Sequence, residues 1–425
     1  MIEEMIEFIN ASPTAFNAVE NLKDILIAND YQELLEKETF ELKKGGKYFV
    51  TRNQTSIIAF NIGKKLNHPS LHACASHTDC PSFKLKPNPI IKTSLGSKLN
   101  VEKYGGALVR PWFDRALSLA GRVMIDTKNG VEAKIFQDEK PFCILASVAP
   151  HLDSDIENKK LEPAVDLVPI VSLKDNYDFK NYLAKTLKVK KQDILGFDLY
   201  LYPTEKGYVW GENNEFITCH HIDNLECAYT TLLGFINNFN DNNINVYASF
   251  DNEEVGSLTR QGADSDFFVN TIKRICNALN IDYGQLLSQG MMLSCDNAHG
   301  IHPNHPELYD KDNTCKLNEG VVIKYNSNQS YTSDSLSASL FKKLLSNNKL
   351  PYQEFTNKTG VRGGSTLGNI SNGHVSLISV DIGLPQWAMH SPIETCGSKD
   401  VQTMVMAIKK FYKAHLQVKG NTYTL

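Results

Sequence analysis

The segment from 246 to 256 constrains the fold of this chain more than any other part. It begins with the apolar run Val-Tyr-Ala-Ser-Phe, which is typical of a short buried strand. Three carboxylates follow directly, at Asp251, Glu253 and Glu254, and Gly256 then permits a sharp turn. Carboxylates at the end of a buried strand are costly unless something positive compensates them, and a divalent metal ion is one such partner. A solvated acidic turn after an edge strand is the alternative interpretation.

Other short apolar strands also end near side chains that can bind a metal ion. Three further runs have this arrangement: 71–75 with His77, 290–295 with Asp296, and 375–380 with His390. In open α/β sheets, ligands bind beyond the carboxyl ends of the strands, where side chains distant in sequence can converge. The repetition therefore predicts an α/β fold with a metal site at one edge of its sheet.

Two further acids are candidates to support this site. Residues two apart in an extended segment point the same way, so Asp79 can hold one nitrogen of His77 and leave the other for a metal. Asp223 lies just before the segment 225–235, which has helical periodicity. Simpler interpretations remain open for each: a surface polar pair for His77 and Asp79, and a helix cap for Asp223.

Composition excludes several classes of protein. The formal net charge of −4 and the lack of a phosphate-tracking Lys/Arg run predict no nucleic-acid partner. The amino terminus lacks the pattern of a secretory signal, and no apolar stretch reaches the roughly 18 residues of a membrane span, so we expect no membrane association. The nine cysteines are scattered and never spaced as CxxC, which predicts free thiols and a cytoplasmic location.

A change in composition and in the pattern of predicted strands divides the chain. At 425 residues, two domains are expected rather than one. Prolines and lysines cluster between 81 and 89, and residues 90–215 then contain many short strand patterns separated by glycine turns. We expect a first segment at 1–89 and a strand-rich block at 90–215, and the pattern of the first segment resumes at 216–425; the resemblance described below implies that the block at 90–215 is an inserted domain.

Local patterns also predict individual elements. They include a helix with Ser12 as its cap and Pro13 in its first turn, and a hairpin around Asn53 and Gln54. The remaining elements are a helix within 175–191, a strand at 321–325, a helix at 333–345, a glycine-rich loop at 363–368, and a last helix at 399–416.

Taken together and in order, these motifs resemble the M18 family of metallo-aminopeptidases, the aspartyl aminopeptidases and their bacterial relatives. The resemblance runs nearly end to end. It rests on the segments 12–19, 76–79, 104–106, 112–115, 150–152, 222–225, 250–257, 296–299, 302–304, 363–368 and 388–391.

The resemblance implies a mixed-sheet zinc-aminopeptidase catalytic domain, with helices on both faces, interrupted by the inserted β-rich dimerisation domain. It further implies two divalent metal ions, expected to be Zn²⁺, with Mn²⁺ or Co²⁺ as alternatives. Asp223 would bridge the ions, His77 and Asp296 would complete one coordination sphere, and Glu254 and His390 the other. Glu253 would be the general base for the attacking water, with Asp79 behind His77.

The same resemblance implies residues for specificity. Lys324 would pair with an acidic substrate side chain, and the alternative is a surface lysine on an edge strand. His151 would reach the active site of a neighbouring subunit, and the alternative is a core histidine. Gly364, Ser365 and Thr366 would line the substrate pocket, and the alternative is a tight structural turn.

The chain departs from the family pattern in places. Gly360 stands where many relatives have an Asp, which puts some substrate contacts in doubt. His221 stands where an arginine is common, and Asn17 replaces a histidine. None of these positions is a proposed ligand or the proposed base.

The expected function is therefore removal of an N-terminal Asp or Glu from peptides by a cytoplasmic enzyme. By the same resemblance, dimers would assemble into a tetrahedral dodecamer. Alternatives are a broad or neutral N-terminal preference, a metal-free hydrolase with paired carboxylates, and a non-catalytic peptide-binding shell of the same fold. The metal-free reading leaves His77 and His390 without a role, and a non-catalytic shell would be expected to have lost Glu253 or a ligand.

Overall fold

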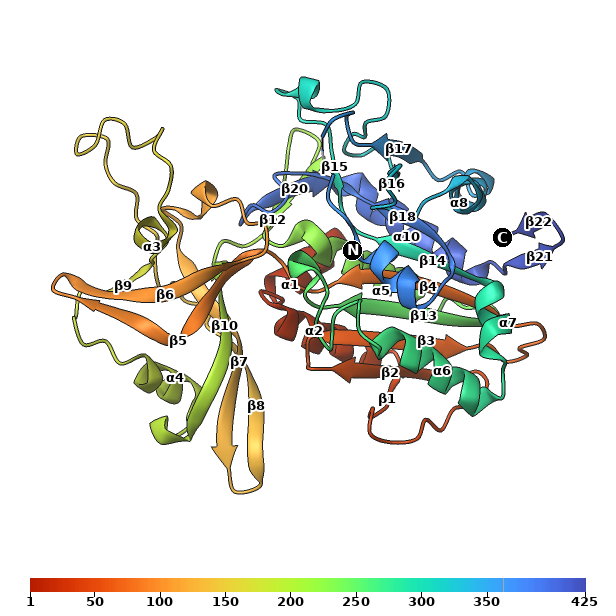
Figure 1. Ribbon diagram of the computed structural model, residues 1–425, viewed down its shortest axis with the longest axis horizontal. Coiled ribbons are helices and arrows are strands. Elements are labelled where there is room, and N and C mark those ends of the chain that lie inside the picture. Colours follow the sequence, from red (N-terminus) through yellow and green to blue (C-terminus); the bar gives the residue numbers. More distant parts are fainter. Residues whose placement is uncertain (362) are drawn as a thin grey trace.

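The largest element of the structure is a mixed sheet of nine strands (Figure 1). The structure is a computed structural model that describes residues 1–361 and 363–425. In spatial order the strands are β1 (Gln32–Glu33), β2 (Lys47–Arg52), β3 (Ser56–Ile62), β13 (Asn243–Phe250), β4 (Ser70–His77), β14 (Gly290–Cys295), β18 (Ile378–Gly383), β16 (Val321–Tyr325) and β17 (Tyr352–Thr356). The central four, β13, β4, β14 and β18, run parallel, so their carboxyl ends meet at one edge.

Helices cover both faces of this sheet, as the alternation of its buried side chains requires. Along β13, Tyr247 packs into one apolar cluster, whereas Val246 and Ala248 pack into the other. The first cluster includes residues of α1 (Ile2–Asn10), α2 (Ala15–Ala28), α5 (Ile222–Phe235), α8 (Ser335–Asn347) and α10 (Ser398–Lys413). The second includes residues of α6 (Phe267–Leu279), α7 (Tyr283–Ser288) and α9 (Leu367–His374).

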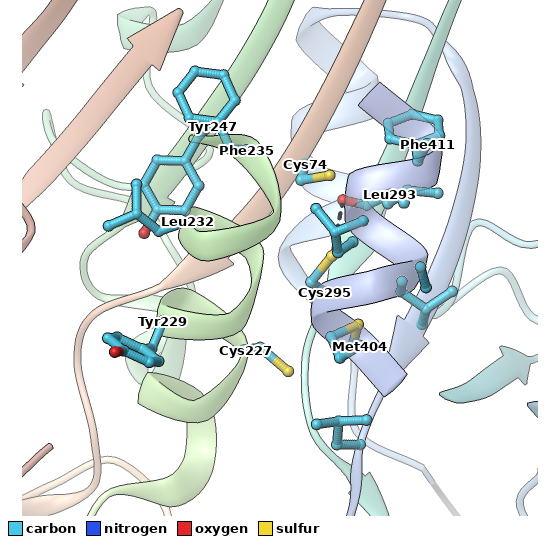
Figure 2. Close-up of a cluster of buried hydrophobic side chains, with 14 of the residues drawn as sticks. Cys74, Cys227, Tyr229, Leu232, Phe235, Tyr247, Leu293, Cys295, Met404 and Phe411 are labelled. Carbon is cyan, nitrogen blue, oxygen red and sulfur yellow. Dashed lines mark hydrogen bonds between the residues drawn. The ribbon is translucent and has the colours of Figure 1, made fainter. Parts of the chain in front are cut away.

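Figure 2 shows how α5 and α10 close the first face. Phe235 at the end of α5 packs against Tyr247 of β13, and Met404 and Phe411 project from α10 toward the sheet residues Leu293 and Cys295. All of these side chains are fully buried. The expected fold class, an α/β domain with helices on both faces of a mixed sheet, is confirmed.

A second sheet lies beside the first and has a core of its own (Figure 1). Its six strands pair antiparallel in the order β8 (Gly130–Gln137), β7 (Leu117–Thr127), β10 (Ile194–Pro203), β5 (Ser82–Thr93), β6 (Gly96–Tyr104) and β9 (Ile170–Ser172). Two helices accompany it, α3 (Pro163–Asp166) and α4 (Phe179–Leu187). The sheet begins at Ser82, within the range expected for the first catalytic segment, and the domain limits 1–89, 90–215 and 216–425 stay a prediction.

A small third sheet connects distant parts of the chain next to the central strand ends. It has the order β11 (Tyr208–Trp210), β12 (Phe216–Cys219), β20 (Glu394–Gly397), β19 (Pro385–Trp387) and β15 (Ala298–His299). Pairing of β12 with β20 sets Cys219 opposite Glu394 and so brings the segment before α5 beside the segment after His390. The chain ends in the hairpin of β21 (Gln417–Lys419) and β22 (Thr422–Thr424).

Several predicted element limits were wrong by a few residues. The cap of α2 is Thr14, not Ser12, and the Thr14 hydroxyl donates to the Asn17 side chain at 2.6 Å. Helix α8 begins at Ser335, because Asp334 accepts a hydrogen bond from the Ser337 amide. The strand expected at 375–380 is β18 at 378–383, because α9 extends to His374. The last helix ends at Lys413, three residues before the expected limit.

Other predictions from local patterns hold. Strands β2 and β3 form the expected hairpin, and Asn53 and Gln54 both adopt positive φ in its turn. The structure describes all nine cysteines, and each is a free thiol. Among the helices formed by residues 1–361 and 363–425, none combines the length and apolar character that a bilayer crossing requires.

Candidate metal centre

Five side chains from separate elements meet at the carboxyl edge of the central strands. His77 is the last residue of β4, Asp296 directly follows β14, and Glu254 lies in the short helix η3 (Glu253–Val255) after β13. Asp223 lies in the first turn of α5, where its backbone is not yet helical, and His390 lies between β19 and β20. One ligand atom from each of His77, Asp223 and Glu254 lies within 4.8 Å of the others.

The two oxygens of Asp223 face two different groups of ligands. On one side, the His77 Nε2 atom lies 3.5 Å from Asp223 Oδ1 and 3.7 Å from Asp296 Oδ1. On the other side, the His390 Nε2 atom lies 3.5 Å from Asp223 Oδ2 and 3.4 Å from Glu254 Oε2. We call these the first position and the second position. The structure thus brings together all five residues that the sequence suggested as ligands.

These separations fit atoms that share a metal ion. Two ligand atoms that each lie about 2.0–2.1 Å from a tetrahedral ion are roughly 3.3 Å apart. A good N–H···O hydrogen bond would be about 2.9 Å, shorter than any of the four distances. Asp223 Oδ1 is also buried and has no hydrogen-bond partner among the described residues. Imidazole nitrogens and carboxylate oxygens are a donor set that suits zinc, so the residues fit such an ion.

Without a cation, the buried carboxylates at this edge of the sheet repel one another strongly. Burial raises the pKa of Glu254 well above its ordinary value, and the nearby Asp223 carboxylate raises it further. Burial also raises the pKa of Glu253 to about 8, although His77 opposes this shift. Burial lowers the pKa of His77, but the neighbouring carboxylates of Asp223 and Asp296 outweigh it and hold that pKa well above its usual range. A cation among these carboxylates would relieve the repulsion.

Asp79 contacts both His77 and the two glutamates, and it holds His77 in a different way than expected. Its main-chain carbonyl oxygen lies 2.9 Å from His77 Nδ1, whereas its carboxylate is 3.6 Å from that nitrogen. A proton on Nδ1 leaves Nε2 free to face the first position. The carboxylate instead accepts the main-chain amides of Glu253 at 3.1 Å and Glu254 at 3.2 Å. Asp79 therefore orients His77 through its backbone and the two glutamates through its side chain.

The second sheet contributes residues that the sequence reasoning did not place at the site. The Tyr104 hydroxyl donates to the Asp79 carboxylate at 2.6 Å and accepts from the Asn252 side chain at 2.9 Å. The Gly106 carbonyl lies 3.3 Å from His390 Nδ1. In the sequence, these residues were marked only by the motif Tyr-Gly-Gly at 104–106. Nothing in the spacing of that motif predicts that it lies near the strand ends that carry the ligands.

Lys324 is buried in an inner strand, so the alternative of a surface lysine on an edge strand is wrong. Strand β16 lies between β18 and β17, and Lys324 is 2% exposed. Its ammonium donates to the main-chain oxygens of Asp296 at 2.9 Å and Asn297 at 3.3 Å. Burial lowers its pKa, but the Asp296 carboxylate, with an oxygen 3.8 Å away, outweighs burial and keeps the ammonium charged. Lys324 therefore supports the chain at a ligand of the first position.

His151 and the glycine-rich loop lie outside this arrangement of ligands. His151 is exposed in the segment between β8 and α3, which Figure 1 shows as a loop directed away from the nine-stranded sheet, so the core-histidine alternative is wrong. Gly364 and Ser365 are exposed. Thr366 is buried at the start of α9 and donates its hydroxyl to Asp381. That contact favours a structural role for Thr366, and the pocket roles of all three stay predictions.

Comparison with known proteins shows which family and which solved structures this chain is similar to. Residues 8–412 match the profile of a family described as Aminopeptidase I zinc metalloprotease (M18). The chain is 41% identical over 422 residues to a probable M18 family aminopeptidase 2 of Clostridium novyi, which covers 96% of this chain and 98% of the relative.

Solved structures agree with the sequence matches. The cryo-EM structure of a complex of Ape4 and Nbr1 contains a chain that aligns with a TM-score of 0.93 at 33% identity, over 97% of this chain and 85% of that one. The structure of the mApe1 dodecamer of S. cerevisiae aligns with a TM-score of 0.85 at 25% identity, over 97% of this chain and 96% of that one.

Proposed function

The chain belongs to the M18 family of zinc metallo-aminopeptidases, and from that premise we propose that it removes an acidic N-terminal residue from peptides with the help of two Zn²⁺ ions. Membership of the family makes it a metallo-aminopeptidase and excludes the metal-free hydrolase and the non-catalytic shell. The number of ions, their identity and the preference for Asp or Glu are the parts that we propose. Mn²⁺ and Co²⁺ are the alternative ions.

The arrangement around Asp223 carries the proposal of two ions. Each carboxylate oxygen faces a different histidine, at 3.5 Å in both cases, and each histidine has a further carboxylate within 3.7 Å. When bound, such ions polarise the scissile carbonyl and make water a nucleophile near neutral pH. One shared carboxylate with two additional ligands on each side is the protein contribution that two adjacent ions need.

Glu253 is the residue that we assign to proton transfer. It is not among the five ligands, yet its carboxyl is close enough to His77 and Asp296 for their charges to shift its pKa. It takes the proton of the attacking water and passes it to the leaving amine, while Asp79 fixes its backbone. An uncharged Glu253 could not accept that proton, and its raised pKa of about 8 in the protein alone would fall next to cations.

The preference for an acidic first residue rests on Lys324. An ammonium has three donors, and two of them contact the main-chain oxygens of Asp296 and Asn297. The third remains for a substrate carboxylate that enters beside the first position. A neutral side chain would leave this buried charge less well compensated, which is the physical basis of selection. A broad or neutral preference is the alternative.

The assembly and location follow as further parts of the proposal. The mApe1 relative forms a dodecamer, and we propose a homo-oligomer of the same kind, with 90–215 as the inserted domain that pairs subunits. The exposed His151 would then be free to reach a neighbouring active site. The free thiols at all nine cysteines support a cytoplasmic location.

Glu253→Gln is the experiment that tests the chemistry. It keeps the shape of the side chain but removes its capacity to accept a proton, so kcat should fall by roughly 10²- to 10⁴-fold while bound metal stays at the wild-type level. Activity on chromogenic amides of Asp, Glu, Leu and Ala, with metal content measured on the same samples, provides both readouts. Loss of metal together with activity would show that Glu253 is a ligand and not the base.

A further inference from the structure

Glu394, which the sequence reasoning did not consider, is buried directly behind the metal centre. It is the first residue of β20, and 2% of its surface is exposed. Pairing of β20 with β12 carries its carboxylate under the backbone that leads into α5. A buried carboxylate needs partners to offset its desolvation, so the identity of those partners shows what it holds.

The two oxygens of Glu394 bind the backbones of two proposed ligands. The main-chain amide of Asp223 donates to Oε2 at 2.9 Å, and the main-chain amide of His390 donates to Oε1 at 2.8 Å. The side chain of Gln386 supports Oε1 with a further hydrogen bond of 3.3 Å. All three partners are donors. Asp223 lies in α5 and His390 lies in the connection between β19 and β20, so Glu394 links two separate parts of the chain.

We propose that Glu394 is a positioning residue of the metal centre. Its carboxylate fixes the distance between the backbones of Asp223 and His390, and so holds their side chains ready for the ion at the second position. The first position depends on it only through Asp223. This inference rests on the two-ion centre proposed above.

The effect of its removal should appear in metal binding before it appears in turnover. Glu394→Gln keeps the size of the side chain but turns one acceptor into an NH₂ group, which faces a backbone N–H and cannot bind it. Loss of a group that orients metal ligands typically weakens metal affinity about 10- to 100-fold. We expect a loss of this size for one of two bound equivalents and a smaller loss for the other.

The experiment is a titration of the metal-free full-length protein with Zn²⁺ against a fluorescent chelator, for wild type and E394Q. Glu226→Gln is the matched control. Glu226 is also fully buried, but one of its oxygens accepts from the Asn297 side chain at 2.7 Å and the other has no hydrogen-bond partner among the described residues, so an amide can keep that bond. Its variant should bind both equivalents as the wild type does.

Each outcome of the titration is decisive. Equal affinity of folded E394Q and wild type at both equivalents would overturn the role of Glu394, as would an equal loss in E226Q. A wild type that binds fewer than two ions per chain would instead refute the two-ion centre. If circular dichroism shows that E394Q does not fold, Gln386→Leu decides the question. It removes only the supporting donor, so a smaller loss at the same equivalent supports the proposal, and unchanged affinity overturns it.

Discussion

Removal of a single hydroxyl group from the second sheet should slow the reaction without altering substrate binding. Tyr104 donates to the Asp79 carboxylate at 2.6 Å, and that carboxylate accepts the amides of Glu253 and Glu254. Burial raises the pKa of Tyr104 well above its ordinary value, so the phenol keeps its proton and remains a donor. In Tyr104→Phe the Asp79 carboxylate loses its shortest hydrogen bond, and Asn252 loses an acceptor.

The size of the effect follows from the charge on the acceptor. A hydrogen bond to a charged group contributes about 1.5–3 kcal/mol. If this whole free energy is lost from transition-state stabilisation because Glu253 is less well oriented, kcat falls by roughly 10- to 150-fold, since 1.36 kcal/mol corresponds to a factor of ten. KM should change by no more than about threefold, because the Tyr104 hydroxyl bonds to Asp79 and Asn252, and neither is a proposed ligand or substrate contact.

The assay compares kcat and KM of Tyr104→Phe with those of Tyr200→Phe at saturating Zn²⁺. Tyr200 is a matched control, because its ring packs edge-on against that of Tyr104 at 5.5 Å, while in the described part of the chain its hydroxyl has no hydrogen bond to Asp79. The absorption spectrum of the Co²⁺-loaded protein should shift in Y104F alone. Wild-type kcat in Y104F, or an equal loss in both variants, would refute the idea that Tyr104 acts through Asp79.

Two further predictions concern Lys324 and the bound metal. Lys324→Ala should lower kcat/KM for Asp and Glu amides far more than for Leu amides, and an equal loss would show that the lysine only anchors Asp296. Removal of metal with a chelator should make stability fall as pH rises from 5 to 8, by up to about 1.36 kcal/mol per pH unit for each group concerned. The folded pKa of Glu253 is raised to about 8, so over this range the folded state holds a proton that the unfolded state has lost, and the raised pKa of His77 adds to the fall only above its ordinary pKa of about 6.5. Thermal unfolding at several pH values measures this slope, which should disappear on addition of Zn²⁺.

The central strands and the ligands at their ends could be predicted because parallel strands buried on both faces have continuous apolar runs. Strand β14 at 290–295 and strand β16 at 321–325 match their predicted limits. The strand near 378 was misplaced, because Val375 and Leu377, which follow the end of α9, lie in one apolar run with the start of β18, and periodicity cannot divide so short a run.

The supporting residues could not be predicted in the same way. Glu394 and its partner Asp223 are 171 positions apart in the sequence, and their contact depends on the pairing of β12 with β20. Tyr104 meets Asp79 only because the second sheet packs against the first. A lone glutamate or tyrosine gives no local pattern, since its role is set by which backbone or carboxylate the fold brings to it.

The close approach of Gly106 to His390 limits how this enzyme can be simplified. A β-carbon on Gly106 would lie 2.8 Å from His390 Nδ1, so the two halves of the molecule meet there with no room for even a methyl group. A truncated protein without the six-stranded sheet would open the second position to solvent on one flank, even if the remaining half folded. An engineered minimal catalyst based on this fold would therefore need another structural element to cover that flank of the second position.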